Sequence, residues 1–189
     1  MRRPNRLLGL SLAVLAAILI GIFAASIQRT SPVLTLSDGS KLKMTTWAQG
    51  SQLRIFHGSW WQRIVFQCFG TNLPARLRGN ASVFPSLYTN GSLGLVFTHF
   101  AEGGPLQDTL NGSAQLTGIG PGGKAVSGQI RGVNFNTANV EGGEKVVAEE
   151  ILWEFPLLTQ KEIRFRLYET NGLSNAVVTN EFLMRNPSR

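Results

Sequence analysis

A glycine-rich string at Gly118–Lys124 is the segment whose spacing best fits a phosphate-binding motif. It satisfies both G-x-G-x-x-G and G-x-x-x-x-G-K, patterns in which backbone amides cradle phosphate oxygens. A phosphate loop also needs a hydroxyl for Mg²⁺ directly after the lysine, and a helix that begins there. Ala125 has no hydroxyl, and residues 125–135 read as a strand interrupted by glycines. We therefore predict a flexible hairpin loop here, with no nucleotide as cofactor or partner.

Nucleophilic catalysis would need a histidine beside Cys68 or beside a serine, and the chain has only two histidines. His99 occupies an alternating strand position, where packing or surface exposure is the usual explanation. His57 directly precedes a possible helix start and is the better candidate base. Cys68 lies on a predicted apolar helix face, where burial would raise its pKa and oppose formation of a thiolate. A hydrolase centred on His57 is therefore an alternative function.

The carboxylates do not have the spacing of a metal site. Asp38 and Asp108 are isolated, and neither belongs to a calcium-binding loop. Glu149 and Glu150 are adjacent, so on a strand they point to opposite faces. No pair of histidines has the spacing of a zinc motif. We predict no metal.

Four tryptophans, at positions 47, 60, 61 and 153, could offer a stacking surface for a sugar. On a helix Trp60 and Trp61 lie about 100° apart, so both cannot be buried equally and one should be partly exposed. The more frequent role of tryptophan is to seal the border of a core. A carbohydrate-binding module is thus a further alternative, and the candidate binding residues are His57, Trp60, Trp61 and Arg63.

The formal net charge of +7 does not indicate nucleic-acid binding. Arg2, Arg3, Arg6 and Arg29 flank a hydrophobic run and supply four of those charges. Residues 30–189 hold 14 Lys and Arg against 11 Asp and Glu, a balance of +3 without a dense basic run. Nucleic acid is therefore not expected among the partners.

Residues from Leu7 to Ile27 form 21 consecutive uncharged and mostly apolar positions. About 20 helical residues cross a bilayer core, so this segment predicts a transmembrane signal anchor. The arginines before it place residues 1–6 in the cytoplasm and send the rest across the cell membrane as a single-pass protein. A cleaved signal peptide is the rival, since Ala24, Ala25 and Ser26 resemble a poor cleavage site. The early glutamate of pilin-type leaders is missing.

After a linker at residues 28–32, the pattern over residues 33–187 is that of an extracytoplasmic β domain. Residues 33–36 and 41–44 alternate on either side of Asp38-Gly39, which predicts a hairpin. Alternating runs between glycine- or asparagine-rich turns follow from residue 80 onward, at 94–100, 112–117, 126–135, 146–155, 161–169 and 176–184. We predict an antiparallel β-sandwich, immunoglobulin- or C2-like.

Residues 59–69 are the one helix expected in this domain. Ser59 and Gln62 fit a capping box. Apolar residues then recur at helical spacing, namely Trp61, Ile64, Val65, Cys68 and Phe69. Gly70 and Pro74 should end the helix.

Several short strings together resemble an uncharacterised bacterial family with an N-terminal hydrophobic segment and a β-rich domain. The strings are residues 36–40, His57-Gly58 with Trp60-Trp61, residues 153–156, residues 164–169, and Phe182 through Asn186-Pro187. The resemblance covers most of residues 33–187, but not the glycine-rich middle at 79–143. It implies this architecture and no activity.

The function that these patterns favour is that of a membrane-anchored envelope protein. Its β domain would bind or scaffold an envelope protein or polymer without catalysing a reaction. The hydrolase centred on His57 and the sugar-binding module stay open beside it.

Overall fold

The computed structural model describes residues 31–186 except for 58–60, 63–64, 67–73, 111–112, 141–142 and 171–175. The predicted anchor from Leu7 to Ile27 and the basic segment 1–6 lie outside the described residues, as does most of the linker 28–32. Within the described part of the chain, no helix has the length and apolar character needed to cross a bilayer.

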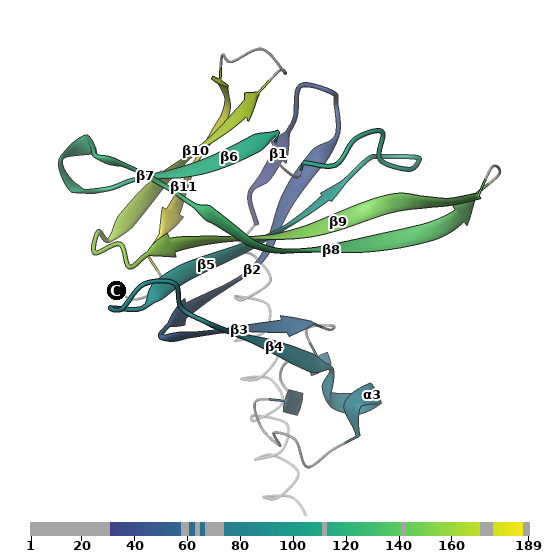
Figure 1. The fold of residues 1–189 in the computed structure, drawn as a ribbon, viewed down its shortest axis with the longest axis horizontal. Coiled ribbons are helices and arrows are strands. Elements are labelled where there is room, and N and C mark those ends of the chain that lie inside the picture. Colours follow the sequence, from purple (N-terminus) through teal and green to yellow (C-terminus); the bar gives the residue numbers. More distant parts are fainter. Residues whose placement is uncertain are drawn as a thin grey trace, which may run out of the picture. The chain divides into compact units, whose positions relative to one another are not determined.

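Antiparallel strands make up most of the domain, which confirms the predicted β class (Figure 1). The larger sheet has the order β1 (Val33–Thr35), β2 (Lys41–Gly50), β5 (Ser92–Phe100), β9 (Gly143–Pro156), β8 (Gln129–Val140). The second sheet has the order β11 (Ala176–Arg185), β10 (Glu162–Thr170), β6 (Ala114–Ile119), β7 (Ala125–Ser127). A separate hairpin pairs β3 (Gln52–His57) with β4 (Asn80–Pro85).

The predicted first hairpin is confirmed. Leu34 pairs with Leu42 across β1 and β2, and both side chains are buried. Gly39 adopts a φ of +84°, which its Asp-Gly turn requires and which other residues rarely accept. Pairing continues on the far side, where β2 lies against β5 along its whole length. The turn at residues 37–40 is therefore fixed at one end of the larger sheet.

One hydrophobic core joins the two sheets. Phe97 of β5 packs on Phe182 of β11, with ring centroids 6.0 Å apart. Phe155 of β9 packs on Phe165 of β10 at 5.2 Å. The alternation predicted for β10 is confirmed, because Ile163, Phe165 and Leu167 are fully buried, whereas Arg164 is exposed. Burial of these large side chains is the main driving force that holds the sheets together.

The β3–β4 hairpin covers part of the opposite face of the larger sheet. Leu53 and Ile55 of β3 are buried against Val96 of β5 and Leu152 of β9, in a second, smaller core. Gly94 permits this approach, since a Cβ there would lie 2.9 Å from Leu53 Cδ1. The hairpin therefore forms an extra layer on the larger sheet (Figure 1).

Within the predicted helix 59–69, Trp61, Gln62, Val65 and Phe66 are helical, and the rest of the segment lies outside the described residues. The prediction of a single helix is wrong, because α3 follows at Ala75–Arg78. Pro74 was expected only to end a helix. Its fixed φ and missing N–H instead suit a helix start, and the Leu77 amide donates to the Pro74 carbonyl at 2.9 Å.

Candidate functional site

The turn between β1 and β2 holds the first component of a polar site. The Asp38 carboxylate accepts hydrogen bonds from the Ser40 amide at 2.9 Å and from the Ser40 hydroxyl at 2.6 Å. Burial alone would raise the pKa of Asp38. The two Ser40 hydrogen bonds and nearby His99 outweigh burial, and the pKa lies below its usual value. Asp38 is therefore an anion at neutral pH.

His99 and Glu149 form a buried pair beside this turn. They are direct partners on β5 and β9, and His99 Nδ1 lies 2.8 Å from Glu149 Oε1. Their side chains are 1% and 0% exposed. Glu149 Oε1 also accepts the Leu110 amide at 2.5 Å. The pair therefore fixes the loop that leads from β5 to β6.

The other ring nitrogen of His99 reaches Ser40, which completes a serine–histidine–glutamate row. His99 Nε2 lies 2.6 Å from Ser40 Oγ. Asp38 Oδ1 accepts from the same Ser40 hydroxyl at 2.6 Å, so the carboxylate and the imidazole both contact one oxygen. In a hydrolytic triad the serine hydroxyl is directed at the histidine. The row has the order of a triad, but its serine also donates to a second carboxylate.

Glu169 of β10 reaches the same turn from the second sheet. Its Oε2 accepts the Ser37 amide at 3.0 Å and the Ser37 hydroxyl at 2.5 Å. The residue is only 8% exposed. Its Oε1 atom is buried and has no hydrogen-bond partner among the described residues. A buried acceptor without a partner is costly, so a ligand that donates a hydrogen bond would relieve that cost.

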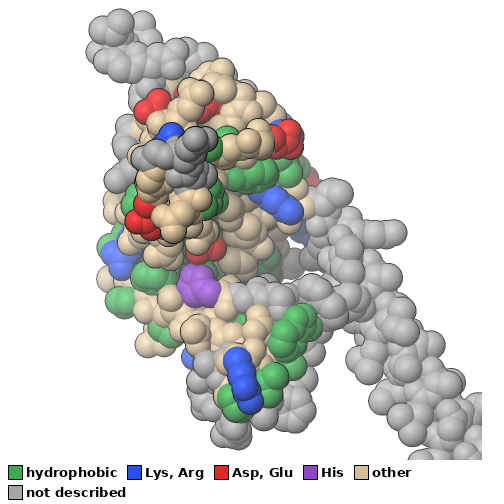
Figure 2. All heavy atoms as spheres, turned by 90° about the vertical axis from the view of Figure 1, so that its right-hand side faces the viewer, with side chains coloured by type: hydrophobic (Ala, Val, Ile, Leu, Met, Phe, Trp, Pro, Cys, Tyr) green, Lys and Arg blue, Asp and Glu red, His purple; other side chains and the backbone are tan. Residues whose placement is uncertain are grey.

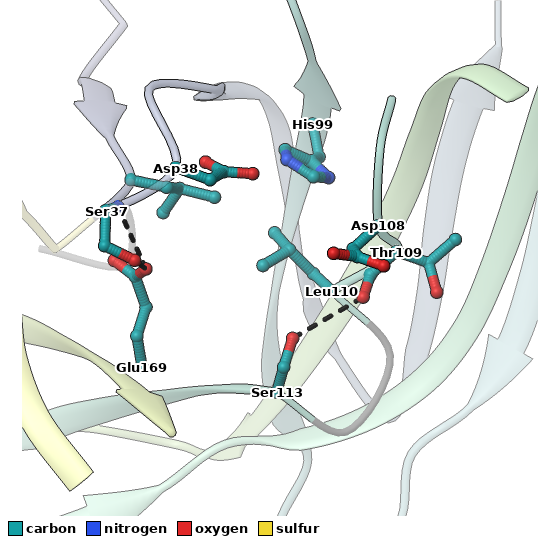
Figure 3. A pocket seen from close by; sticks show the side chains of 9 residues that line it. Ser37, Asp38, His99, Asp108, Thr109, Leu110, Ser113 and Glu169 are labelled. Carbon is teal, nitrogen blue, oxygen red and sulfur yellow. Dashed lines mark hydrogen bonds between the residues drawn. The ribbon is translucent and has the colours of Figure 1, made fainter. Parts of the chain in front are cut away.

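A pocket of about 340 Å³ lies between these groups (Figure 3). Asp38 and Ser37 border it on one side, and Asp108, Thr109 and Ser113 on the other. His99, Leu36, Leu110 and Glu169 complete the lining. Three carboxyl groups, those of Asp38, Asp108 and Glu169, line the pocket, and its described lining contains no Lys or Arg. The arrangement is suited to a positively charged group that donates hydrogen bonds.

This acidic pocket was not expected from the sequence, because Asp38 and Asp108 are isolated there. A signal was present nonetheless. His99 shares the buried alternation of Leu95 and Phe97, and Glu149 shares that of Ile151 and Trp153. Two ionisable residues at core positions of separate strands need partners. Only the strand pairing shows that they meet each other.

The predicted site at His57 has neighbours of its own. His57 ends β3, and its Nε2 lies 2.9 Å from Ser82 Oγ on β4. Its Nδ1 lies 3.4 Å from Glu150 Oε2 on β9. Beside them a cavity of about 110 Å³ lies between the hairpin and the larger sheet, lined by Ile55, Phe84, Val96, Val133 and Leu152 among others. A serine and a carboxylate are thus both within reach of His57.

Of the remaining predicted binding residues, Trp61 alone belongs to the part of the chain that the structure describes. Trp61 is 41% exposed, as expected for one of the two neighbouring tryptophans. Trp60, Arg63 and Cys68 lie outside the described residues. Trp47 is 39% exposed, and Trp153 is fully buried in the main core.

The glycine-rich string forms the hairpin loop that was predicted. Gly118 and Ile119 belong to β6, a short 3-10 turn covers Pro121–Gly123, and Ala125 begins β7. The Gly120 amide donates to the Lys124 carbonyl at 2.7 Å, which closes the loop. A strand thus follows Lys124, where a phosphate loop would have a helix. Across the described residues, no three His, Cys, Asp or Glu side chains gather in a metal-binding cluster.

Comparison with known proteins gives no relative from which a role could be inferred. No family model matches the chain, no curated protein matches it, and no solved structure matches its fold. The resemblance to an uncharacterised bacterial family accordingly stays a prediction.

Proposed function

We propose that this chain is a membrane-anchored envelope protein whose extracytoplasmic β domain binds a positively charged group in the acidic pocket. The observation that carries the proposal is Glu169 Oε1, which has no partner among the described residues and belongs to a residue that is 8% exposed and lines the pocket. Asp38 and Asp108 add negative charge at the same opening. An ammonium or guanidinium group of an envelope protein or polymer would match both the charge and the missing donor.

Hydrogen bonds hold two of the carboxylates that line the pocket in place, as a binding site requires. Asp38 is held by Ser40, and Ser40 by His99. Glu169 comes from the other sheet and is held by Ser37.

The hydrophobic core that the two sheets share supports the narrower prediction of a β-sandwich. Its likeness to an immunoglobulin or C2 domain stays a prediction.

The anchor from Leu7 to Ile27 supplies the location in this proposal. The prediction of this anchor rests on the uncharged run and on the arginines that precede the run. Cleavage within this run would instead release the domain outside the membrane.

Photo-cross-linking in the host cell tests the binding role. A benzophenone amino acid in place of exposed Thr109 lies at the pocket, and one in place of exposed Leu183 on β11 serves as the control. We expect a discrete adduct from position 109 and none from position 183. Equal adducts from both positions, or none from position 109, would refute a ligand in this pocket.

A hydrolase centred on His57 is a second candidate, favoured by the contact of His57 with both Ser82 and Glu150. In that reading His57 is the base, Ser82 the nucleophile and Glu150 the group that orients the histidine. A fluorophosphonate probe tests it on the whole protein. Labelling of Ser82 that is lost in His57→Ala would establish this reading, and an unlabelled Ser82 would dismiss it.

A further inference from the structure

Acidic residues are missing from one continuous third of the chain. Residues 39–101 contain six Lys and Arg and no Asp or Glu. Residues 102–189 contain eight Lys and Arg against ten Asp and Glu. The β3–β4 unit, defined as β3, β4, α3 and the described helical residues between β3 and α3, lies entirely within the acid-free part. Its described surface therefore carries positive charge without compensating carboxylates of its own.

The same unit exposes large apolar side chains. Trp61 is 41% exposed, Leu77 of α3 is 43% exposed, and Val83 of β4 is 51% exposed. Figure 2 shows hydrophobic and basic side chains together at the lower end of one face, with acidic side chains above them. Because exposed tryptophan, leucine and valine are unfavourable in water, their gathering on one small unit marks an interaction surface.

Two contacts within the unit connect its residues, one across the hairpin and one between the two helical segments. Arg54 lies directly opposite Val83 in the β3–β4 pairing, and both are exposed. Gln62, next to Trp61, donates a hydrogen bond to the carbonyl of Arg76 at 3.0 Å. Leu77 follows Arg76 on α3.

The opposite face of the hairpin is already occupied. Leu53 and Ile55 alternate with Arg54 and are buried against the larger sheet. The surface that carries Arg54 and Val83 therefore points away from the domain.

We propose that this surface docks on an anionic lipid bilayer. Arginines matched to anionic headgroups, with a tryptophan and aliphatic side chains between them, are the composition of an interfacial membrane contact. A soluble anionic polymer would satisfy Arg54 and Arg76 but would leave Trp61, Leu77 and Val83 in water. The proposal rests on the proposed function in one respect, since the anchor would keep the domain beside a membrane.

Full-length protein reconstituted into vesicles tests the docking. An environment-sensitive NBD dye is attached to Leu77→Cys in a Cys68→Ala background, and to Leu183→Cys as the matched control on the other sheet. In vesicles with 30% phosphatidylglycerol we expect blue-shifted, brighter emission from position 77, relative to pure phosphatidylcholine. The dye at position 183 should emit as it does in water on both kinds of vesicle. Hydrogen exchange of residues 75–85 in the unmodified protein is a second readout, and we expect slower exchange on the anionic vesicles.

Charge reversal supplies the control for electrostatics. Arg54→Glu with Arg76→Glu should abolish the dye response, whereas Lys124→Glu with Lys161→Glu changes the net charge equally and should preserve it. Emission at position 77 that is equal on both vesicles, or that responds to polyphosphate in solution, would overturn bilayer docking. Flotation of the protein with vesicles reports the anchor separately, so loss of the dye response with retained flotation refutes only the docking surface.

Discussion

Glu149 and Glu150 point to opposite faces of β9, and each lies against one of the two histidines of the chain. Glu149 is fully buried beside His99, with 2.8 Å between Oε1 and Nδ1. Glu150 is 26% exposed and lies 3.4 Å from His57 on the hairpin side. One dipeptide therefore contributes to both candidate sites, at very different degrees of burial.

This difference predicts unequal effects of two equivalent substitutions. Glu149→Ala leaves His99 buried without its carboxylate and the Leu110 amide without its acceptor, and should lower the free energy of unfolding by about 3–5 kcal/mol. Glu150→Ala removes a partly exposed pair and should cost at most about 1 kcal/mol. Urea unfolding of both variants measures the difference. Similar losses would mean that His99 and Glu149 are not the buried pair described here.

Glu169 should contribute to stability through Ser37. Glu169→Ala removes the acceptor of the Ser37 amide and hydroxyl, and we expect a loss of about 1–3 kcal/mol. Glu162→Ala, at an exposed position of the same strand, is the matched control and should change stability by no more than about 0.5 kcal/mol. Glu169→Gln keeps an acceptor oxygen and should retain most of the stability. A loss in the glutamine variant as large as in alanine would show that charge, and not the hydrogen bonds, holds the turn.

Asp38 should make the domain less stable in acid. Its pKa in the folded protein lies below the ordinary value of 3.8, because the hydrogen bonds from Ser40 and nearby His99 outweigh burial. A lowered folded pKa contributes stability above the unfolded pKa, and that contribution is lost as the pH falls through the folded value. Unfolding of Asp38→Asn should therefore depend less on pH below about 4 than unfolding of the unsubstituted protein. Identical pH profiles would contradict the Ser40 contacts.

Two glycines near the start of β8 should respond differently to alanine. A Cβ at Gly128 would lie 2.6 Å from the fully buried Phe155 ring, whereas a Cβ at Gly132 meets nothing within 4 Å. Gly128→Ala should cost about 1–3 kcal/mol by overpacking, and Gly132→Ala should be tolerated. Thermal unfolding of the two variants compares them. Equal melting temperatures would place Phe155 elsewhere.

The predicted topology has its own test. A reporter enzyme fused after Arg189 should be active only if it is exported, and extraction of the protein should require detergent. The arginines before Leu7 predict this orientation by the positive-inside rule. Recovery of a soluble form that begins near residue 27 would replace the anchor by a cleaved signal peptide.

Much of the fold could be predicted because the alternation of apolar and polar residues along a strand is a local property of the sequence. The Asp38-Gly39 turn and the inward positions of Ile163, Phe165 and Leu167 follow from short stretches of sequence. The helix after Pro74 was missed because proline is both a common stop and a good first residue of a helix.

The acidic pocket was missed for a different reason. It joins Ser37 to Glu169, which are 132 residues apart, and His99 to Glu149, which are 50 residues apart. Such contacts depend on strand order and register, and neither follows from local patterns. The missing acids of residues 39–101 are visible in the sequence, yet only the strand pairing shows that Arg54 and Val83 share an outward face.

The proposed function depends on the negative charge of the pocket. The yield of the cross-link from position 109 tests the role of that charge most directly. Glu169→Gln removes one negative charge at nearly constant shape, and Glu162→Gln removes the same charge at an exposed site on the same strand. We predict that the adduct is lost or strongly reduced in Glu169→Gln and unchanged in Glu162→Gln. An adduct of equal yield in both variants would contradict recognition of a positively charged group by Glu169.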